Sequence, residues 1–239
     1  TLFNICGVLT EAVMADKLLT PAGEWLYDNF YLIEDQIRTT KRHLPKSYSR
    51  ELPLLAKGTS ANLPRVYDIA LQAISHGDGR VDTESLRRFV TAYQSVANLQ
   101  LGELWAIPIM LRLSLIENLR RVGVYVAAGR TDRNLADTWA DEIIRVAAKD
   151  PKSLVLVIAD MARSDPPMTT PFISELVRRL QGQGPALALP LTWIEQRLAE
   201  SNQTIDQLVQ LGNQQQAADQ VSISNSINSL RTLGAIDWR

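Results

Sequence analysis

Residues 101–120 read LGELWAIPIMLRLSLIENLR, and this stretch decides the fold class. Its apolar side chains lie at nearly every angle around a helix instead of along one stripe, which is typical of a helix covered on most sides. We therefore expect a central, buried helix over residues 101–127. Pro108 removes one backbone hydrogen bond inside it and is expected to kink it near Leu104.

Capping residues and prolines mark helix starts along the rest of the chain. Thr20-Pro21, Asp150-Pro151 and Thr170-Pro171 each place a capping side chain before a proline, which loses no hydrogen bond at the first helical position. Thr204 and Gln207 have the spacing of a capping box. With helical periodicity, these signals predict further helices from Thr20 to Pro45, at about 48–57 and 64–76, after Asp82, and at 132–148, 151–163, 171–181, 190–200, 204–217 and 221–233.

The fold class predicted from these elements is all-α, an irregular multi-helix bundle around the central, Pro-kinked helix. Only Leu154–Ile158 has the propensity of a buried strand, and we interpret it as helix because Pro151 opens it and no partner strand is visible. We expect an N-terminal helical bundle over 1–127 and a second helical layer over 128–239. A single continuous domain over 1–239 is nearly as compatible with the pattern.

Composition excludes several classes of protein. A hydrophobic fraction of 46% and a charged fraction of 21% are those of a folded chain, not of a disordered one. Lys and Arg number 25 against 26 Asp and Glu, so no basic surface for nucleic acid is expected. The longest apolar run, from Leu104 to Leu111, is far shorter than the ~20 residues that span a bilayer.

The residues that usually carry enzyme chemistry are scarce. Cys6, His43 and His76 are too few for a structural zinc site, and two histidines leave little for a catalytic triad. Asp78 and Asp82 lack the ligand series of a calcium loop, and no glycine-rich phosphate loop is present. We therefore assign no catalytic, cofactor-binding or metal-binding residue and expect no cofactor.

Charged residues interrupt the most apolar helix and need partners there. Glu103, Arg112, Glu117 and Arg120 are interpreted as a buried structural ion network, because an unpaired buried charge is costly. A pair of catalytic carboxylates drawn from Glu24, Glu103 and Glu117, as in glycosidases, stays open as the less favoured reading.

The tryptophans have two possible roles. They occur at helical spacings among aliphatic residues, which favours core packing over a platform for stacking sugars. They are Trp25, Trp105, Trp139, Trp193 and Trp238.

An ordered series of segments covering about residues 19–239 resembles the cyclic β-1,2-glucan synthases, in the part that precedes the glycosyltransferase domain. The segments are Leu19–Leu26, Asp28–Phe30, Ile33–Ile37, Leu44-Pro45, Arg50–Pro53, Pro64–Tyr67, Ile74–Arg80, Phe89–Gln94, Gly102–Ala106, Pro108, Leu115–Arg120, Val221–Ile223, Ser229–Arg231 and Asp237-Trp238.

The resemblance implies a very large parent enzyme of the bacterial inner membrane. Such an enzyme polymerises glucose from UDP-glucose into β-1,2-linked chains, with its own protein as primer, and closes the chains into rings. The transferase motifs and membrane helices of the family have no counterpart here, so no catalytic residue is carried over. Because the chain starts at Thr1 without methionine and stops just after an apolar pattern, we expect it to be a fragment of such a protein.

Two functional hypotheses follow from the resemblance. The first is a non-catalytic helical domain on the cytoplasmic face of the membrane, which packs against or regulates the transferase region of its own polypeptide. The second is a helical domain that binds or processes β-1,2-glucan through exposed Trp or paired Glu residues. A free-standing helical adaptor is a distant third.

Overall fold

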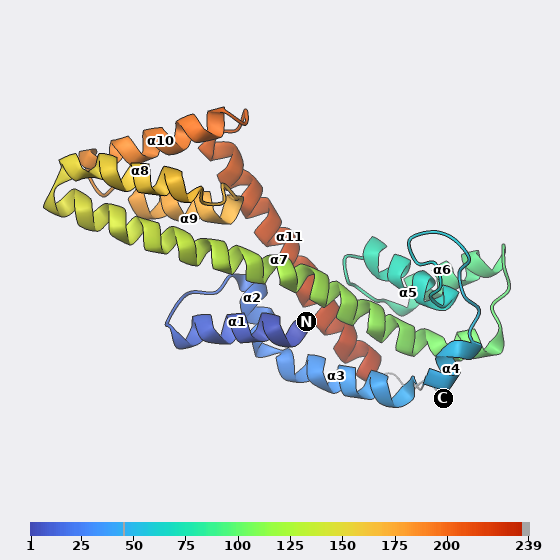
Figure 1. The fold of residues 1–239 in the computed structure, drawn as a ribbon. Coiled ribbons are helices and arrows are strands. Elements are labelled where there is room, and N and C mark those ends of the chain that lie inside the picture. Colours follow the sequence, from blue (N-terminus) through green and yellow to red (C-terminus); the bar gives the residue numbers. More distant parts are fainter. Residues whose placement is uncertain (45, 236–239) are drawn as a thin grey trace. The chain divides into compact units, whose positions relative to one another are not determined.

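A computed structural model of the chain describes residues 1–44 and 46–235 and confirms an all-α fold (Figure 1). In the described ranges the extended segments form no strand, only an isolated bridge between Leu54 and Pro64. The helices are α1 (Leu2–Met14), α2 (Pro21–Asp28), α3 (Phe30–His43), α4 (Lys46–Glu51), α5 (Arg65–His76), α6 (Thr83–Gln94), α7 (Leu101–Lys149), α8 (Leu154–Ser164), α9 (Thr170–Leu180), α10 (Ala188–Ala199) and α11 (Ile205–Ala235), with 3₁₀ turns η1 (Pro151–Ser153) and η2 (Pro185–Leu187).

The chain divides into two compact units. The first contains Thr1–Val124 together with the C-terminal segment that begins at Ala218, and the second contains Tyr125–Ala217. The first unit is therefore discontinuous in sequence: its α7 and α11 residues are separated by the whole second unit.

The first unit is built on the opening half of α7. Met110, Leu111, Leu115 and Leu119 are buried there, four positions that lie along one face of the helix. They share the unit with buried apolar residues of its other helices, which are Leu2, Ile5, Leu9, Leu26, Ile33, Val66, Ile74, Ile227 and Leu230. Helix α1 was not predicted, although its buried Leu2, Ile5, Leu9 and Ala12 have helical spacing.

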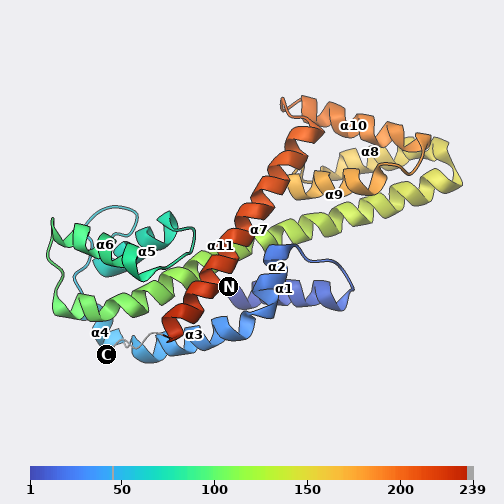
Figure 2. The ribbon, with the colours of Figure 1, turned by 180° about the vertical axis from the view of Figure 1, so that it is seen from behind.

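The second unit has a core of its own. Phe172, Ile173, Leu176 and Leu180 of α9 are fully buried, and side chains from α7, α8, α10 and α11 complete the cluster. Figure 2 shows α8, α9 and α10 lying alongside one another. The strand-like run Leu154–Ile158 lies in α8, which confirms its interpretation as helix.

Two predicted breaks are wrong, because α7 and α11 are each continuous helices. The expected gap at 128–131 contains one glycine and no proline, and glycine costs a helix only about 1 kcal/mol. Gly129 is buried, and its Cα approaches Pro171 so closely that an added Cβ would lie 3.3 Å from the ring. Helix α7 also continues through Pro108.

A break that was not predicted separates α2 from α3 at Asn29. The Asn29 amide donates to the Trp25 carbonyl over 2.8 Å, and its side-chain oxygen accepts from Arg231. Asn competes with helical hydrogen bonds in this way, so α2 ends at Asp28 and α3 begins at Phe30, with only Asn29 between them.

Three smaller predictions also need correction. Helix α4 ends at Glu51 and not near residue 57, because Pro53 disfavours helical geometry in the residue before it. The N-cap of α9 is Thr169 and not Thr170. The spacing of Leu86, Phe89, Val90 and Tyr93 also predicts a buried stripe on the helix after Asp82, but in α6 these four residues are only half-buried.

Helix starts at Thr20 and Thr204 agree with the sequence. The Thr20 hydroxyl accepts from Gly23 N over 3.3 Å. Thr204 and Gln207 form both bonds of the predicted capping box, at 3.1 and 3.2 Å.

A tight turn after α5, which we call the Gly77–Val81 turn, is held by polar side chains of α11. The Ser229 hydroxyl donates to the Gly79 carbonyl and accepts from Val81 N, each over 2.9 Å. The Asn118 amide donates to Ser222 and Ser226 over 2.9 Å each and closes the same cluster. Gly79 has φ +81°, and a Cβ there would lie 2.2 Å from the Ser226 hydroxyl oxygen. Only glycine fits this position.

We expect Gly79→Ala to lower the free energy of unfolding by about 2–5 kcal/mol, because a left-handed backbone and a steric clash add together. Gly58→Ala is the matched control, since Gly58 also has positive φ but nothing within 4 Å of its added Cβ. We expect about 1–2 kcal/mol for the control. Urea unfolding followed by circular dichroism measures both, and equal losses would contradict the close packing of the turn.

Candidate functional site

One face of α7 and the end of α3 line an open groove of about 550 Å³. Leu104, Trp105, Pro108, Ile109 and Arg112 follow each other at helical spacing on α7 and form one wall. Thr39 and His43, four residues apart on α3, line the groove as well. We call this site the Trp105 groove; all its residues belong to the first unit.

Trp105 is the large apolar side chain that this groove exposes. The side chain is 65% exposed, so the prediction that it packs in the core is wrong. Its position on the apolar helix suggested burial, but the neighbouring Leu104, Pro108 and Ile109 are also only half-buried. Sequence periodicity does not show whether another element covers that face; among the described residues of this unit, none covers Trp105.

The other tryptophans differ from Trp105. Trp139 and Trp193 are partly buried against the core of the second unit, as predicted. Trp25 is half-buried in α2. Trp238 lies outside the described residues.

Arg112 contributes a buried cation to the Trp105 groove. It is 8% exposed, and burial lowers the pKa of its guanidinium. Its Nε donates to Gln36 Oε1 over 3.1 Å and its Nη2 to the Leu233 carbonyl over 2.7 Å. Both partners are neutral, and no described carboxylate pairs with Arg112.

Glu103 lies nine residues earlier on α7, more than two turns before Arg112, and is fully buried. Its two oxygens accept from Arg65 Nε and Nη2 over 2.6 Å each, and Oε2 also accepts from Gln100 N over 2.9 Å. Burial raises the pKa of the Glu103 carboxyl, but these hydrogen bonds outweigh burial and hold the pKa below its usual value. Glu103 is therefore an ionised carboxylate that caps the start of α7 and pairs with α5.

The prediction that four charged residues of α7 form one buried ion network is wrong. Glu103 pairs with Arg65, while Arg112 binds only neutral groups. Glu117 and Arg120 form a separate, exposed pair on α7 at 2.6 Å. The partner of Glu103 could not be found from sequence, since Arg65 precedes it by 38 positions on another helix.

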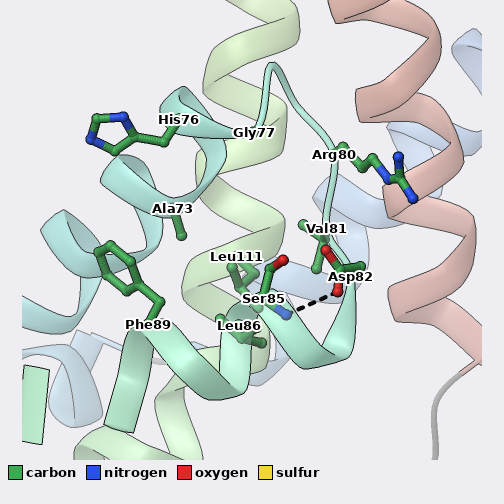
Figure 3. A pocket seen from close by; sticks show the side chains of 10 residues that line it. All are labelled: Ala73, His76, Gly77, Arg80, Val81, Asp82, Ser85, Leu86, Phe89 and Leu111. Atoms are coloured by element: carbon green, nitrogen blue, oxygen red, sulfur yellow. Dashed lines mark hydrogen bonds between the residues drawn. The ribbon is translucent and has the colours of Figure 1, made fainter. Parts of the chain in front are cut away.

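A second cavity, of about 420 Å³, lies between α5, α6 and α7, and we call it the α6 cavity (Figure 3). His76, Asp82 and Ser85 all line it, which are residue types of a catalytic triad. The Asp82 carboxylate, however, accepts from the Ser85 backbone N over 2.9 Å as the N-cap of α6. Figure 3 shows the His76 ring directed away from both, and no hydrogen bond between described atoms joins it to either.

Other sequence candidates lie apart from these cavities. Glu24 is exposed in the first turn of α2, and Cys6 is half-buried in α1. Among residues 1–44 and 46–235, no group of three His, Cys, Asp or Glu side chains could hold a metal ion. Within the same ranges, every helix is too short or too polar to cross a bilayer.

The comparisons with known proteins give one informative match. The chain is 31% identical over 226 residues to the cyclic beta-(1,2)-glucan synthase NdvB of Rhizobium meliloti (strain 1021). The match covers 95% of this chain but only 8% of that protein. No family model matches the chain. The chain is thus homologous to a segment of a cyclic glucan synthase and spans a small part of its length.

We expect Glu103→Ala to lower the free energy of unfolding by about 3–5 kcal/mol at pH 7, because it leaves the Arg65 cation without its partner. Glu117→Ala is the control, and the loss of its exposed pair should cost below about 1 kcal/mol. Because the folded-state pKa of Glu103 is lowered, its contribution is present above about pH 4.3 and is lost as pH falls further. Urea unfolding at several pH values should therefore show the wild type and Glu103→Ala converging in acid; a constant gap would contradict the ionised pair.

Proposed function

We propose that this chain is a non-catalytic helical domain of a cyclic β-1,2-glucan synthase and acts by packing against, or regulating, other domains of the same polypeptide. The observation that carries the proposal is the asymmetry of the match, which takes in nearly the whole chain and a small part of the relative. A self-contained helical region within a very long protein is expected to work through contacts with its neighbours.

The bonding of the titratable groups supports a structural role. Glu103, the buried carboxylate closest to the groove in sequence, accepts three hydrogen bonds and serves as a helix cap. Asp82 likewise caps α6. Because both carboxylates already have hydrogen-bond partners, a structural role is favoured for them over a catalytic one.

Exposed apolar surface supports the expected contacts. Leu101 on α7, Val96 before it and Tyr31 on α3 are all large and mostly exposed within the first unit. Large exposed apolar side chains offer a surface that a neighbouring domain can cover. In the full-length synthase, the proposed partner is the glycosyltransferase region on the cytoplasmic side of the inner membrane.

Glucan binding is the second candidate function. The observation that favours it is the exposed indole of Trp105 in a groove with polar side chains. Binding and packing are compatible, because a domain that contacts the transferase could also hold its product.

The first experiment removes the segment from the full-length synthase that contains it and replaces it with a flexible linker. We expect glucan formation from UDP-glucose in membrane preparations to fall at least about tenfold, because transferase contacts are lost. Lys57→Ala, a change at an exposed residue, serves as the control and should leave synthesis unchanged.

Immunoblotting of the same membranes corrects each rate for the amount of protein. Undiminished synthesis by the deleted protein, at equal abundance, would refute the proposed role.

A further inference from the structure

We propose that the Trp105 groove is a carbohydrate-binding subsite that holds glucosyl units of β-1,2-glucan, with Trp105 as the stacking platform and Arg112 as the main hydrogen-bond donor. This inference rests on the proposed function for the identity of the sugar. It extends that function by assigning a ligand site to residues of α3 and α7.

The shape of the groove suits a sugar. Its volume of about 550 Å³ falls within the range of small-molecule sites, which is roughly 300–1,000 Å³. The two α7 residues that follow Trp105 on its face, Pro108 and Ile109, are half-buried and apolar. A pyranose ring has an apolar face of C–H groups, which packs on the indole, and a rim of hydroxyls that need polar partners.

Arg112 supplies the strongest polar partner. Two of its three guanidinium nitrogens donate to Gln36 and Leu233, which fixes the orientation of the planar group. Nη1 donates to no described residue, and it is not among the buried atoms that lack a partner, so it keeps contact with solvent. A hydrogen bond from an ionised donor to a sugar hydroxyl is roughly twice as strong as a neutral one, and here it would take the place of a bond to water.

Thr39 and His43 add hydrogen-bonding groups on the opposite wall. Neither side chain bonds to a described neighbour, and both line the groove. The α3 wall thus offers one hydroxyl and one imidazole, and the α7 wall one aromatic face and one guanidinium. Hydroxyl-rich ligands need such a mixture of donors and acceptors beside an apolar surface.

A protein segment is a less suitable occupant of the same groove. Apolar protein contacts are strongest where polar groups at the centre are few or already paired. Here the three polar side chains of the groove keep hydrogen-bonding capacity, and one of them is a buried cation.

Calorimetric titration of the chain with linear β-1,2-linked gluco-oligosaccharides tests the subsite, with Trp fluorescence as a second readout. We expect saturable binding with a dissociation constant below about 1 mM. Trp105→Ala should weaken binding at least about tenfold, which corresponds to ~1.4 kcal/mol. Because Trp105 is mostly exposed, this variant keeps the fold, and circular dichroism checks that it does.

Tyr31→Ala is the matched control, since Tyr31 is an equally exposed aromatic residue of α3 that lies outside the groove. Its affinity should stay within about twofold of wild type. Arg112→Lys keeps the charge but loses the planar donor, and we expect it to weaken binding as well. Failure of the wild-type chain to bind, or equal binding by Trp105→Ala, would overturn the subsite. Tighter binding of inorganic phosphate or UDP than of glucan would overturn it too, in favour of an anion site at Arg112.

The same Trp105→Ala change in the full-length synthase separates the two proposals. Reduced glucan synthesis without any sugar binding by the chain would show that the groove contacts protein, which overturns the subsite and leaves the proposed function intact. If instead the deleted synthase is fully active while the chain still binds glucan, the subsite holds and the packing role fails.

Discussion

The bond between Ser229 and the Gly77–Val81 turn is the constraint on which the first unit depends. One hydroxyl both donates to the Gly79 carbonyl and accepts from Val81 N, so it satisfies two backbone groups that no helix serves. Asn118 extends the same contact from α7 to Ser222 and Ser226. Three segments far apart in sequence are thereby fixed to one another by neutral hydrogen bonds, and the apolar residues of α5, α7 and α11 pack around them.

This arrangement also gives the charged residues of α7 their separate roles. Glu103 is held by Arg65 of α5 at the start of the helix, whereas Arg112 reaches α3 and α11 two turns later. A buried ion pair and a buried cation thus lie on the same helix, and only the ion pair has opposite charges in contact. This difference explains why we assign Glu103 a structural role. Arg112, in contrast, keeps one nitrogen that is free to bind a ligand.

Much of the fold could be predicted from sequence, because helix starts and helical periodicity are local signals. Thr20, Asp82 and Thr204 each cap a helix by accepting a hydrogen bond from the residue three positions later, so the signal is local. Leu154–Ile158 could be assigned to a helix because a proline precedes it. The length of α7 could not be predicted, since Gly129 interrupts the sequence pattern but costs a helix only about 1 kcal/mol. The Trp105 groove was missed for a related reason: periodicity identifies an apolar face but does not say whether another element covers it.

The discontinuity of the first unit has a consequence for the order in which the protein folds. The partners in the bond between Ser229 and Gly79 are 150 positions apart, so the ribosome must deliver α11 before the turn can be fixed. Contacts of such long separation close slowly, because a long loop loses entropy on closure. The second unit, whose residues are contiguous, can assemble during that delay. Until then the apolar residues of α5 and α7 lack part of their cover, and transiently exposed apolar surface is what makes partly folded chains aggregate.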